Sequence, residues 1–437
     1  MTFAQAQAYL LGTINETASR RVPNRLDRMR ALLAALGNPQ DRYPSVHVGG
    51  TSGKGSTATM IAAALQASGR RTGLHTKPHL ASVTERARID GVAIDEERFA
   101  ATLTDMMPAI EAVAAEHGRA SYYETLLAIA FAYFAQEAVD VGVIEVGIGG
   151  TLDGTNVLVP LVSVITNVAL DHTEILGDTL AAIAHDKVGI AKPGVPLVSD
   201  VTDPAARVVI EEGCAHAGAP FLPVRDLVRV EPHAGERYGQ SFTVETPHAR
   251  YELALPVLGD FQQRNAATAI LALEQLPPAL RPHAAAVEAG FARLVIPGRM
   301  EFFPSHPAVI FDIAHNADKA RHLADALRSA FPERRFAFVI AVNDSKDAAA
   351  IVDPFAELPG TFSFTSFVTP GRTAMRPQRL ASIAAERGMW GRAIVDPVDA
   401  FSVARRNADA GDIVVVTGST FVVATLRDWW LAHVAKV

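Results

Sequence analysis

A lysine and two hydroxyl residues follow a glycine-rich turn near the start of the chain, in the segment VHVGGTSGKGSTAT that begins at Val46. Apolar residues alternate before the turn, as in a buried strand, and recur at helical spacing behind Lys54. Backbone N–H groups at such a helix start face an anion, and a lysine neutralises its charge. The segment therefore predicts a phosphate-binding loop. The alternative is a glycine-rich turn that binds nothing.

The spacing of this loop departs from the usual Gly-x-x-x-x-Gly-Lys-[Ser/Thr], because Gly55 separates Lys54 from Ser56. A hydroxyl at Ser56 or Thr57 still stands where it can help to hold the Mg²⁺ of a nucleotide. The predicted phosphate-binding residues are Gly50, Thr51, Ser52, Gly53, Lys54, Gly55, Ser56 and Thr57.

Two further polar sites follow buried strands. Residues 140–145 and 161–168 are β-branched runs of the kind covered on both faces of a sheet. The first ends in Glu145, and the second leads to Asp171 and His172. Ligands of open α/β sheets bind beyond the carboxyl ends of strands, so both tails should meet the loop at Lys54. Glu145 is thus a candidate Mg²⁺ ligand, although a solvated acid there, and a helix cap at Asp171–His172, are the alternatives.

Three more groups are candidates with simpler alternatives. Lys187 lies in a predicted helix over residues 179–191, and its alternative is a solvated lysine. Asp312 and His315 close a strand of the C-terminal part, where an N-cap would also explain the aspartate. The turn at Thr417 to Thr420 is best explained as a helix cap.

The composition narrows the class of protein. With 437 residues, 49% of them hydrophobic and 20% charged, the chain is typical of a globular protein with two domains. A net charge of -7 argues against a nucleic-acid partner. Cys214 is the only cysteine, so no internal disulfide forms and a cytoplasmic location is expected. Neither a secretory signal nor a membrane span is expected.

Strand and helix patterns alternate along the chain. Strands are expected at 46–48, 71–76, 86–90, 140–145, 161–168, 308–313, 335–342, 362–368 and 412–417, with a hairpin over 242–258 and helices between. A helix over 23–37 opens with a proline. The predicted fold is α/β: a mostly parallel P-loop-type ATPase sheet over residues 1–296, and a smaller Rossmann-like domain over 297–437.

These motifs together resemble the folylpolyglutamate synthase/dihydrofolate synthase family, within the wider Mur ligase superfamily. The similarity runs nearly end to end. The matching blocks are HVGGTSGKGS from His47, PHL from Pro78, TER from Thr84, Tyr123-Glu124, EVGIGG from Glu145, Leu152-Asp153, Thr155-Asn156, LDHTEILG from Leu170, Lys187, Gly189-Ile190, KPG from Lys192, Gln262, Asn265-Ala, PGRME from Pro297, Asp312, AHN from Ala314 and TGS from Thr417.

The resemblance implies an ATP-dependent ligase. The γ-phosphate would pass to a carboxylate of dihydropteroate or a reduced folate, and the amine of L-glutamate would attack the acyl phosphate. The implied catalytic residues are Lys54, Lys187, His172 and Arg299. The implied metal ligands for two Mg²⁺ ions are Ser56, Glu145, His172 and Lys187 as a carbamate, while Gln262, Asn265, Arg299, Asp312 and His315 would contact ATP. A monomer is expected, with no nucleic-acid or membrane partner.

Four positions depart from the family's pattern. Lys77 replaces a serine, Thr151 an arginine, Phe261 a histidine and Ala317 a proline. Lys77 and Thr151 fall near the acid-substrate site, for which Lys77, His79, Thr151 and Asp153 are the candidates. The alternative functions are a related ligase that joins another acid and amine, an inactive folate- or nucleotide-binding relative, and a P-loop kinase or motor. The sequence does not decide whether the enzyme makes dihydrofolate, extends polyglutamates or does both.

Overall fold

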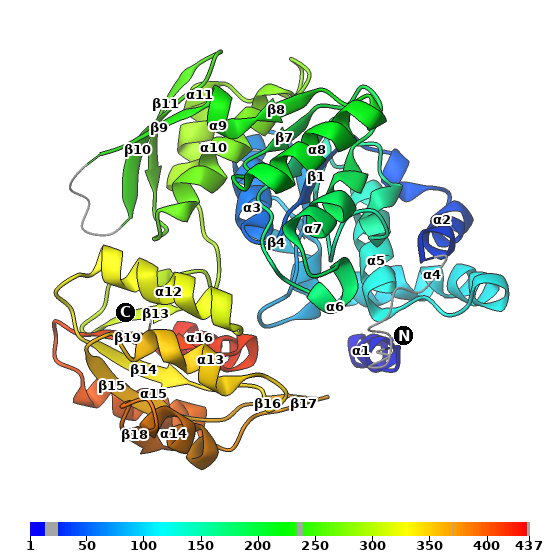
Figure 1. Cartoon of the computed structure of the whole chain (residues 1–437). Coiled ribbons are helices and arrows are strands. Elements are labelled where there is room, and N and C mark those ends of the chain that lie inside the picture. The colour runs from blue at the N-terminus through cyan, green and yellow to red at the C-terminus, as the bar shows by residue number, and fades with distance from the viewer. Residues whose placement is uncertain (14–24, 234–238, 370, 435–437) are drawn as a thin grey trace.

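The computed structural model describes residues 1–13, 25–233, 239–369 and 371–434, which form two α/β parts side by side (Figure 1). The strands of the first sheet, in their order across it, are β4 (Val92–Ala93), β3 (Arg88–Ile89), β2 (Thr72–His75), β5 (Val141–Glu145), β1 (Ser45–Gly49), β6 (Val162–Ile165), β7 (Leu197–Ser199) and β8 (Phe221–Pro223). From β2 to β8 every neighbouring pair is parallel, and β3 and β4 add an antiparallel edge.

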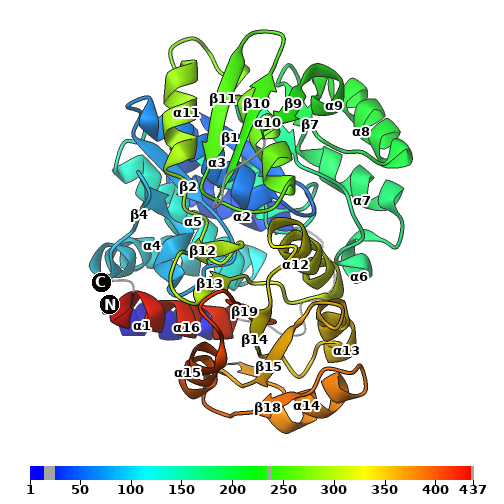
Figure 2. The same ribbon diagram turned by 90° about the vertical axis from the view of Figure 1, so that its left-hand side faces the viewer.

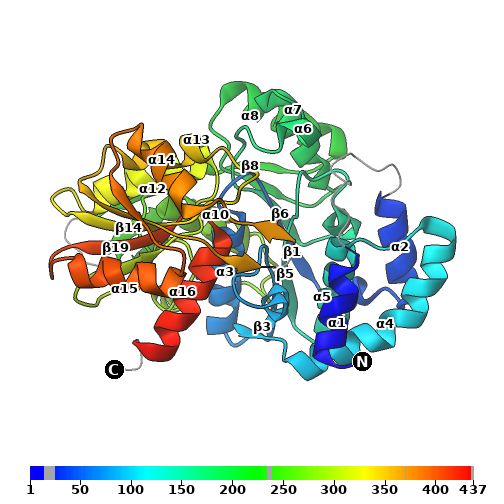
Figure 3. The ribbon, with the colours of Figure 1, turned by 90° about the horizontal axis from the view of Figure 1, so that it is seen from below.

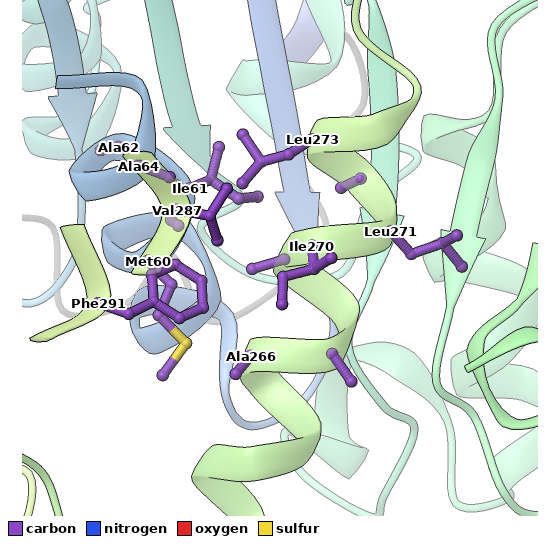
Figure 4. Packing of buried hydrophobic residues seen from close by; sticks show 14 of the residues in the cluster. Met60, Ile61, Ala62, Ala64, Ala266, Ile270, Leu271, Leu273, Val287 and Phe291 are labelled. Atoms are coloured by element: carbon purple, nitrogen blue, oxygen red, sulfur yellow. The ribbon is translucent and has the colours of Figure 1, made fainter. Parts of the chain in front are cut away.

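Helices cover both faces of the first sheet because successive strand residues point to opposite sides. On one face Val143 and Val164 pack against α3 (Lys54–Ala67), α10 (Phe261–Glu274) and α11 (Ala284–Ala292). Figure 4 shows this packing, in which Met60 and Ile61 of α3 lie beside Phe291 and Val287 of α11. The helices of the other face are α1 (Phe3–Leu11), α2 (Arg25–Ala35), α4 (Glu96–His117), α5 (Tyr122–Gln136), α7 (Leu180–Lys187) and α8 (Pro204–Ala217).

The second part repeats this layering on a smaller scale. Its strands, in order across the sheet, are β12 (Glu301–Phe303), β13 (Ala308–Phe311), β19 (Ile413–Thr417), β14 (Phe336–Ile340), β15 (Gly360–Phe364) and β18 (Gly391–Ala393); only β12 is antiparallel to its neighbour. One face carries α12 (Ala317–Ala330), α13 (Ala348–Val352) and α14 (Pro377–Ala385), and the other carries α15 (Pro397–Asn407) and α16 (Thr420–His433).

The two parts touch through small loops, and α12 lies on the side of the second sheet that faces the first part (Figures 1 and 2). Leu80, in the loop after β2, packs against the apolar cluster of β13, β19 and α16. Seen from below, α12 to α16 lie to the left of the first sheet and α1, α2 and α4 to its right (Figure 3). Loops that follow β1, β2 and β6 can therefore meet groups of the second part.

The predicted fold class is confirmed: a large, mostly parallel sheet and a separate C-terminal α/β part. The hairpin is also present, as β10 (Gln240–Glu245) and β11 (Arg250–Leu255), with β9 (Arg229–Pro232) as a third strand. The domain boundary after residue 296 stays a prediction. Within the described residues, no helix combines the length and apolar character that a bilayer span requires.

Two expected strands have clearly different boundaries in the structure. The strand expected over 86–90 is shortened to β3, because Ser82 caps a turn of 3-10 helix at Val83–Arg86. The strand expected over 362–368 begins and ends earlier, as β15, and Val368–Thr369 instead forms the two-stranded ribbon β16 with β17 (Arg372–Thr373). Pro23, the expected start of the second helix, lies outside the described residues.

Glu124 has a structural role. Its carboxylate accepts a bond from the Ser121 N–H at 2.7 Å, completing a capping box at the start of α5. The same carboxylate pairs with Arg28 of α2 at 2.7 Å, and its side chain is only 3% exposed. The family block Tyr123-Glu124 therefore includes a residue that joins two helices of one layer.

We expect Glu124→Ala to lower the free energy of unfolding by about 3 kcal/mol, because it leaves the Arg28 guanidinium buried without its partner and removes a helix cap. Urea titration followed by circular dichroism measures the change. Glu116→Ala is the matched control, since the Glu116 side chain is 83% exposed on α4. Equal stabilities of the two variants would contradict the structural role.

Candidate functional site

The glycine-rich segment joins β1 to α3 as a tight loop. Gly50 has a φ of 134°, and a Cβ there would lie 2.0 Å from the Thr166 hydroxyl, so only glycine fits. Gly53, with a φ of 77°, starts α3, and a Cβ on it would lie 2.4 Å from Asn265 Oδ1. The loop is therefore pressed between the end of β6 and the start of α10, and the predicted strand–loop–helix unit is present.

The residues after β6 hold this loop in shape. The Asn167 side-chain oxygen accepts bonds from the N–H groups of Thr51 at 3.1 Å and Ser52 at 2.8 Å. Thr166 Oγ1 donates to the Ser52 carbonyl at 2.6 Å. Sequence reasoning placed the end of this strand near Lys54 but assigned no role to Thr166 or Asn167, since contacts between distant segments leave no local signal.

Two lysines meet at one carbonyl of the loop. Lys54 Nζ donates to the carbonyls of Gly50 and Thr51, each at 2.9 Å, and Lys187 Nζ donates to the Gly50 carbonyl at 2.9 Å. Lys187 is only 3% exposed, so the solvated alternative for it is wrong. Burial, with the charges of Lys77 and Lys187, holds the pKa of Lys54 well below its usual range.

Glu145 lies at the edge of the same loop. It is buried, its Oε2 accepts the Lys77 N–H at 2.8 Å, and a Cβ on Gly55 would lie 3.3 Å from that oxygen. The solvated-acid alternative is therefore wrong. Lys77 itself has a pKa lowered by burial, which the charges of Glu145 and Asp153 oppose.

His172 lies at the start of the short helix α6 (Thr173–Leu176), in the segment that follows β6. Its ring nitrogens are 4.0 Å from Asp171 Oδ2 and 3.8 Å from Glu174 Oε1, and its side chain is 40% exposed. It makes no side-chain capping bond, so the cap alternative does not hold for the histidine. Burial lowers its pKa, which favours the neutral imidazole that binds metals.

The donor set fits a Mg²⁺ ion bound together with a nucleotide. The described residues contain no cluster of three or more His, Cys, Asp or Glu side chains that could hold a metal by itself. A Mg²⁺ ion that is bound with a nucleotide needs fewer protein ligands, because phosphates and water fill most of its coordination sphere. Glu145 offers a carboxylate at the loop, and Thr57 Oγ1 is buried there without a hydrogen-bond partner among the described residues.

Two amides at the start of α10 adjoin the loop. Asn265 Nδ2 donates to Gln262 Oε1 at 2.9 Å, while Gln262 Nε2 is buried with no partner among the residues described. A buried amide donor without a partner is costly unless a ligand or water satisfies it. The predicted ATP residues Gln262 and Asn265 thus lie beside Gly53.

The second part contributes its own polar groups. Asp312 accepts the N–H groups of Met300 at 2.9 Å and Ala314 at 2.8 Å, and burial raises its pKa. The N-cap of α12 is Asn316, so the cap alternative is wrong for Asp312.

Ser419 caps α16 by accepting the Phe421 N–H, as expected for that turn. Arg299 lies close enough to lower the pKa values of His315 and Lys319 through its charge.

The candidate residues for the acid substrate are hydrogen-bonded to other groups of the protein. Thr151 donates its hydroxyl to the Asp186 carbonyl at 2.9 Å. Asp153 is buried and accepts bonds from Thr155, Tyr123 and the Ile148 N–H. His79 Nδ1 accepts a bond from Arg86 at 3.1 Å, and burial lowers its pKa to about 4. Substrate roles for Thr151, Asp153 and His79 stay predictions.

Sequence reasoning missed Lys319. This lysine lies in the first turn of α12, and its charge lowers the pKa values of Lys54, His172 and Asp171. No motif identified Lys319, because a lysine in the first turn of a helix is ordinarily exposed on the surface. A cavity of about 560 Å³ lies nearby between Phe261, Gln263 and the α12 residues His322 and Asp325, but it contains none of the phosphate-binding residues.

Comparison with known proteins gives the family. Residues 48–273 match the Mur ligase middle domain, and residues 298–420 match the Mur ligase, glutamate ligase domain. The dihydrofolate synthase/folylpolyglutamate synthase of Bacillus subtilis is 33% identical over 407 residues, which are 92% of this chain and 94% of that protein. The chain belongs to the folylpolyglutamate synthase/dihydrofolate synthase family of Mur ligases.

Solved structures of this family have the same fold. The Mycobacterium tuberculosis folylpolyglutamate synthase complexed with ADP superposes with a TM-score of 0.86 at 32% identity, covering 98% of each chain. The Escherichia coli FolC in complex with DHPP and ADP gives a TM-score of 0.85 at 27% identity, covering 99% of this chain and 98% of that one. The expected family and the expected ligase class are thereby confirmed.

Lys77→Ser should weaken binding of Mg²⁺–ADP about tenfold, or ~1.4 kcal/mol, because it removes a half-buried positive charge close to Lys54. It should also change the Mg²⁺ dependence, since a serine hydroxyl can ligate the ion whereas an ammonium cannot. Isothermal titration calorimetry at several Mg²⁺ concentrations measures both.

Arg335→Ser is the control, because it removes an exposed positive charge from the surface. If Lys77→Ser matches the parent in ADP affinity, Mg²⁺ dependence and acid-substrate affinity, Lys77 has no role in the site.

Proposed function

We propose that this family member joins L-glutamate to a folate-type carboxylate at the expense of ATP, as a dihydrofolate synthase, a folylpolyglutamate synthase or both. The observation that carries the proposal is the loop at Gly50, with Lys54 and Lys187 at one carbonyl and Glu145 at its edge. Positive charge and the N-terminus of α3 here suit a triphosphate. The complexes of relatives with ADP, and with DHPP and ADP, support the same ligands.

The reaction follows from charge placement. A carboxylate oxygen of the acid attacks the γ-phosphorus of ATP. The bond between the γ-phosphorus and the bridging β-phosphate oxygen breaks, and ADP leaves. The glutamate amine then attacks the acyl carbon, the new C–N bond forms, and phosphate departs while the amine loses its proton. Lys54 would hold the triphosphate, Gln262 and Asn265 the adenine, and Asp312 and His315 the ribose and phosphate side. Arg299 would stabilise the charge that moves during transfer.

The metal and carbamate assignments extend this proposal. Glu145, His172, Ser56 or Thr57 and a carbamate on Lys187 would hold two Mg²⁺ ions, which neutralise phosphate charge when bound. A carbamate forms when the neutral Lys187 amine bonds to CO₂ and releases a proton. Burial lowers the pKa of Lys187 to about 8, so about a tenth of it is neutral at pH 7. The nearby charges of Lys54 and Lys77 would offset the new anion.

The remaining parts of the proposal concern organisation. Residues 1–296 and 297–437 would act as two domains of a cytoplasmic monomer, with the ATP site between them. Its partners would be dihydropteroate or reduced folates and L-glutamate, and neither nucleic acid nor membrane. The net charge of -7 and the single cysteine support this.

Purified protein with ATP and Mg²⁺ should release phosphate in proportion to glutamate when a pteroate or folate is present. A phosphate-release screen over a panel of acids and a panel of amino acids measures this and separates the two activities. Release with a different acid and amine would support the related-ligase alternative instead. If no pteroate or folate gives glutamate-dependent release, the proposed function is wrong.

Lys187→Ala should lose at least about a hundredfold in turnover, with partial rescue by short carboxylic acids. In ¹³C-bicarbonate, the parent should show a carbamate resonance by NMR that strengthens from about pH 6 to about pH 8, since the neutral amine becomes more abundant toward its pKa of about 8.

Lys192→Ala is the matched control, because this lysine is partly exposed and bonds Asn156. It should keep the resonance. A parent protein without the resonance, or a Lys187→Ala variant that retains it, would contradict the carbamate.

A further inference from the structure

Lys319 is a cation of the second part that faces the phosphate loop of the first. It lies in the first turn of α12, where its backbone N–H donates to the N-cap Asn316 at 2.9 Å. The helix lies on the side of the second sheet that faces the first part (Figures 1 and 2). Its side chain is half-buried, although a lysine in a first helical turn would ordinarily extend into solvent.

The amine of Lys319 is aimed by a neutral histidine. His315 Nδ1 lies 2.8 Å from the Ile313 carbonyl, which can only accept, so the ring proton is on Nδ1. His315 Nε2 is then an acceptor and lies 3.4 Å from Lys319 Nζ. Burial and the charge of Lys319 lower the pKa of His315 to about 4, which keeps this tautomer neutral. The contact is long, so it orients the ammonium without neutralising it.

The charges around Lys319 come from both parts of the molecule. Arg299 and Asp318 lie in the same part of the chain as Lys319. Lys77 and Asp171, in the loops after β2 and β6, shift the pKa of Lys319, and Lys319 in turn lowers the pKa of Lys54 in the loop after β1. Burial raises the pKa of Asp171, but the charges of His172, Lys319 and Lys54 outweigh burial and lower it. Lys319 therefore lies within electrostatic range of Lys54, at the loop that starts α3.

The ammonium group of Lys319 forms no ion pair with a carboxylate of the described residues. Among the described residues, no carboxylate lies within ion-pair distance of Lys319, and its amine bonds only the neutral His315. Lys54 and Lys187, by contrast, are both satisfied by loop carbonyls. Burial, Arg299 and Lys77 lower the pKa of Lys319 to about 8, although the charges of Asp171 and Asp318 oppose them. A half-buried ammonium in these surroundings is unfavourable unless an anion joins it. The arrangement is therefore complete only with an anionic ligand between the two parts.

We propose that Lys319 is a catalytic residue of the ligase reaction: its ammonium contacts the γ-phosphoryl group during transfer, from the side opposite Lys54, and His315 acts as its positioning residue. This inference rests on the proposed function and deepens it. A fixed cation placed where charge moves between oxygens stabilises the transition state more than the bound nucleotide. It works as a positive group brought in from a second domain does in other phosphoryl transfers.

The test compares Lys319→Met and Lys319→Arg with Arg321→Met, which removes an exposed positive charge from the same helix. Turnover is measured as glutamate-dependent ADP formation. The ground-state affinity for nucleotide is measured by calorimetry with ADP. We expect Lys319→Met to lose about a hundredfold in kcat, as for loss of one oxyanion donor, with ADP affinity changed less than about threefold. Lys319→Arg should recover at least about tenfold of that loss, and Arg321→Met should match the parent.

Two results would overturn the inference. One is a kcat of Lys319→Met equal to that of Arg321→Met. The other is a fall in ADP affinity as large as the fall in kcat/KM, which would make Lys319 a ground-state nucleotide contact. Should Lys319→Met fail to fold, as judged by its melting curve, Lys319→Gln is judged by the same criteria. An active parent with an active Lys319→Met defeats this inference alone, whereas an inactive parent defeats the proposed function and this inference with it.

Discussion

The carbonyl of Gly50 is the point on which the site depends. It accepts the ammonium groups of Lys54 and Lys187, which come from different helices and are separated by more than a hundred residues in the chain. The peptide can take this position because Gly50 has no side chain and its φ of 134° is closed to most other residues. A Cβ here would collide with Thr166, and that threonine and Asn167 together fix the shape of the loop.

Excess positive charge is the second organising feature. Lys54, Lys77 and Lys187 come from the first part, and Arg299 and Lys319 from the second. The carboxylates whose charges oppose them are Glu145, Asp153, Asp171, Asp186 and Asp318. Like charges at close range destabilise the protein without a ligand, and a bound polyanion removes the penalty. Because the cations are divided between two parts of the chain, the same anion would also hold those parts together.

Family motifs combine chemistry and architecture, and the structure separates the two. Glu124 belongs to a family block, yet it caps α5 and pairs with Arg28. Asp153 likewise uses its oxygens to order the turn after β5. Glu145, in contrast, has one oxygen bonded to a single backbone N–H and lies against Gly55 of the loop, as a residue awaiting a ligand would.

The sequence by itself determined the fold class, the strand–loop–helix at Lys54 and the strand-end positions of Glu145 and His172. These follow from local patterns: alternation, glycine placement and the rule that sites lie beyond the carboxyl ends of parallel strands. Only the tertiary structure decided that Lys187 is buried at Gly50, that Asn167 shapes the loop, and that Lys319 faces it. Each of these depends on contacts between segments far apart in the chain. A lysine in a first helical turn has the same local sequence signature whether it faces solvent or a phosphate, and only the packing of the second part against the first distinguishes the two.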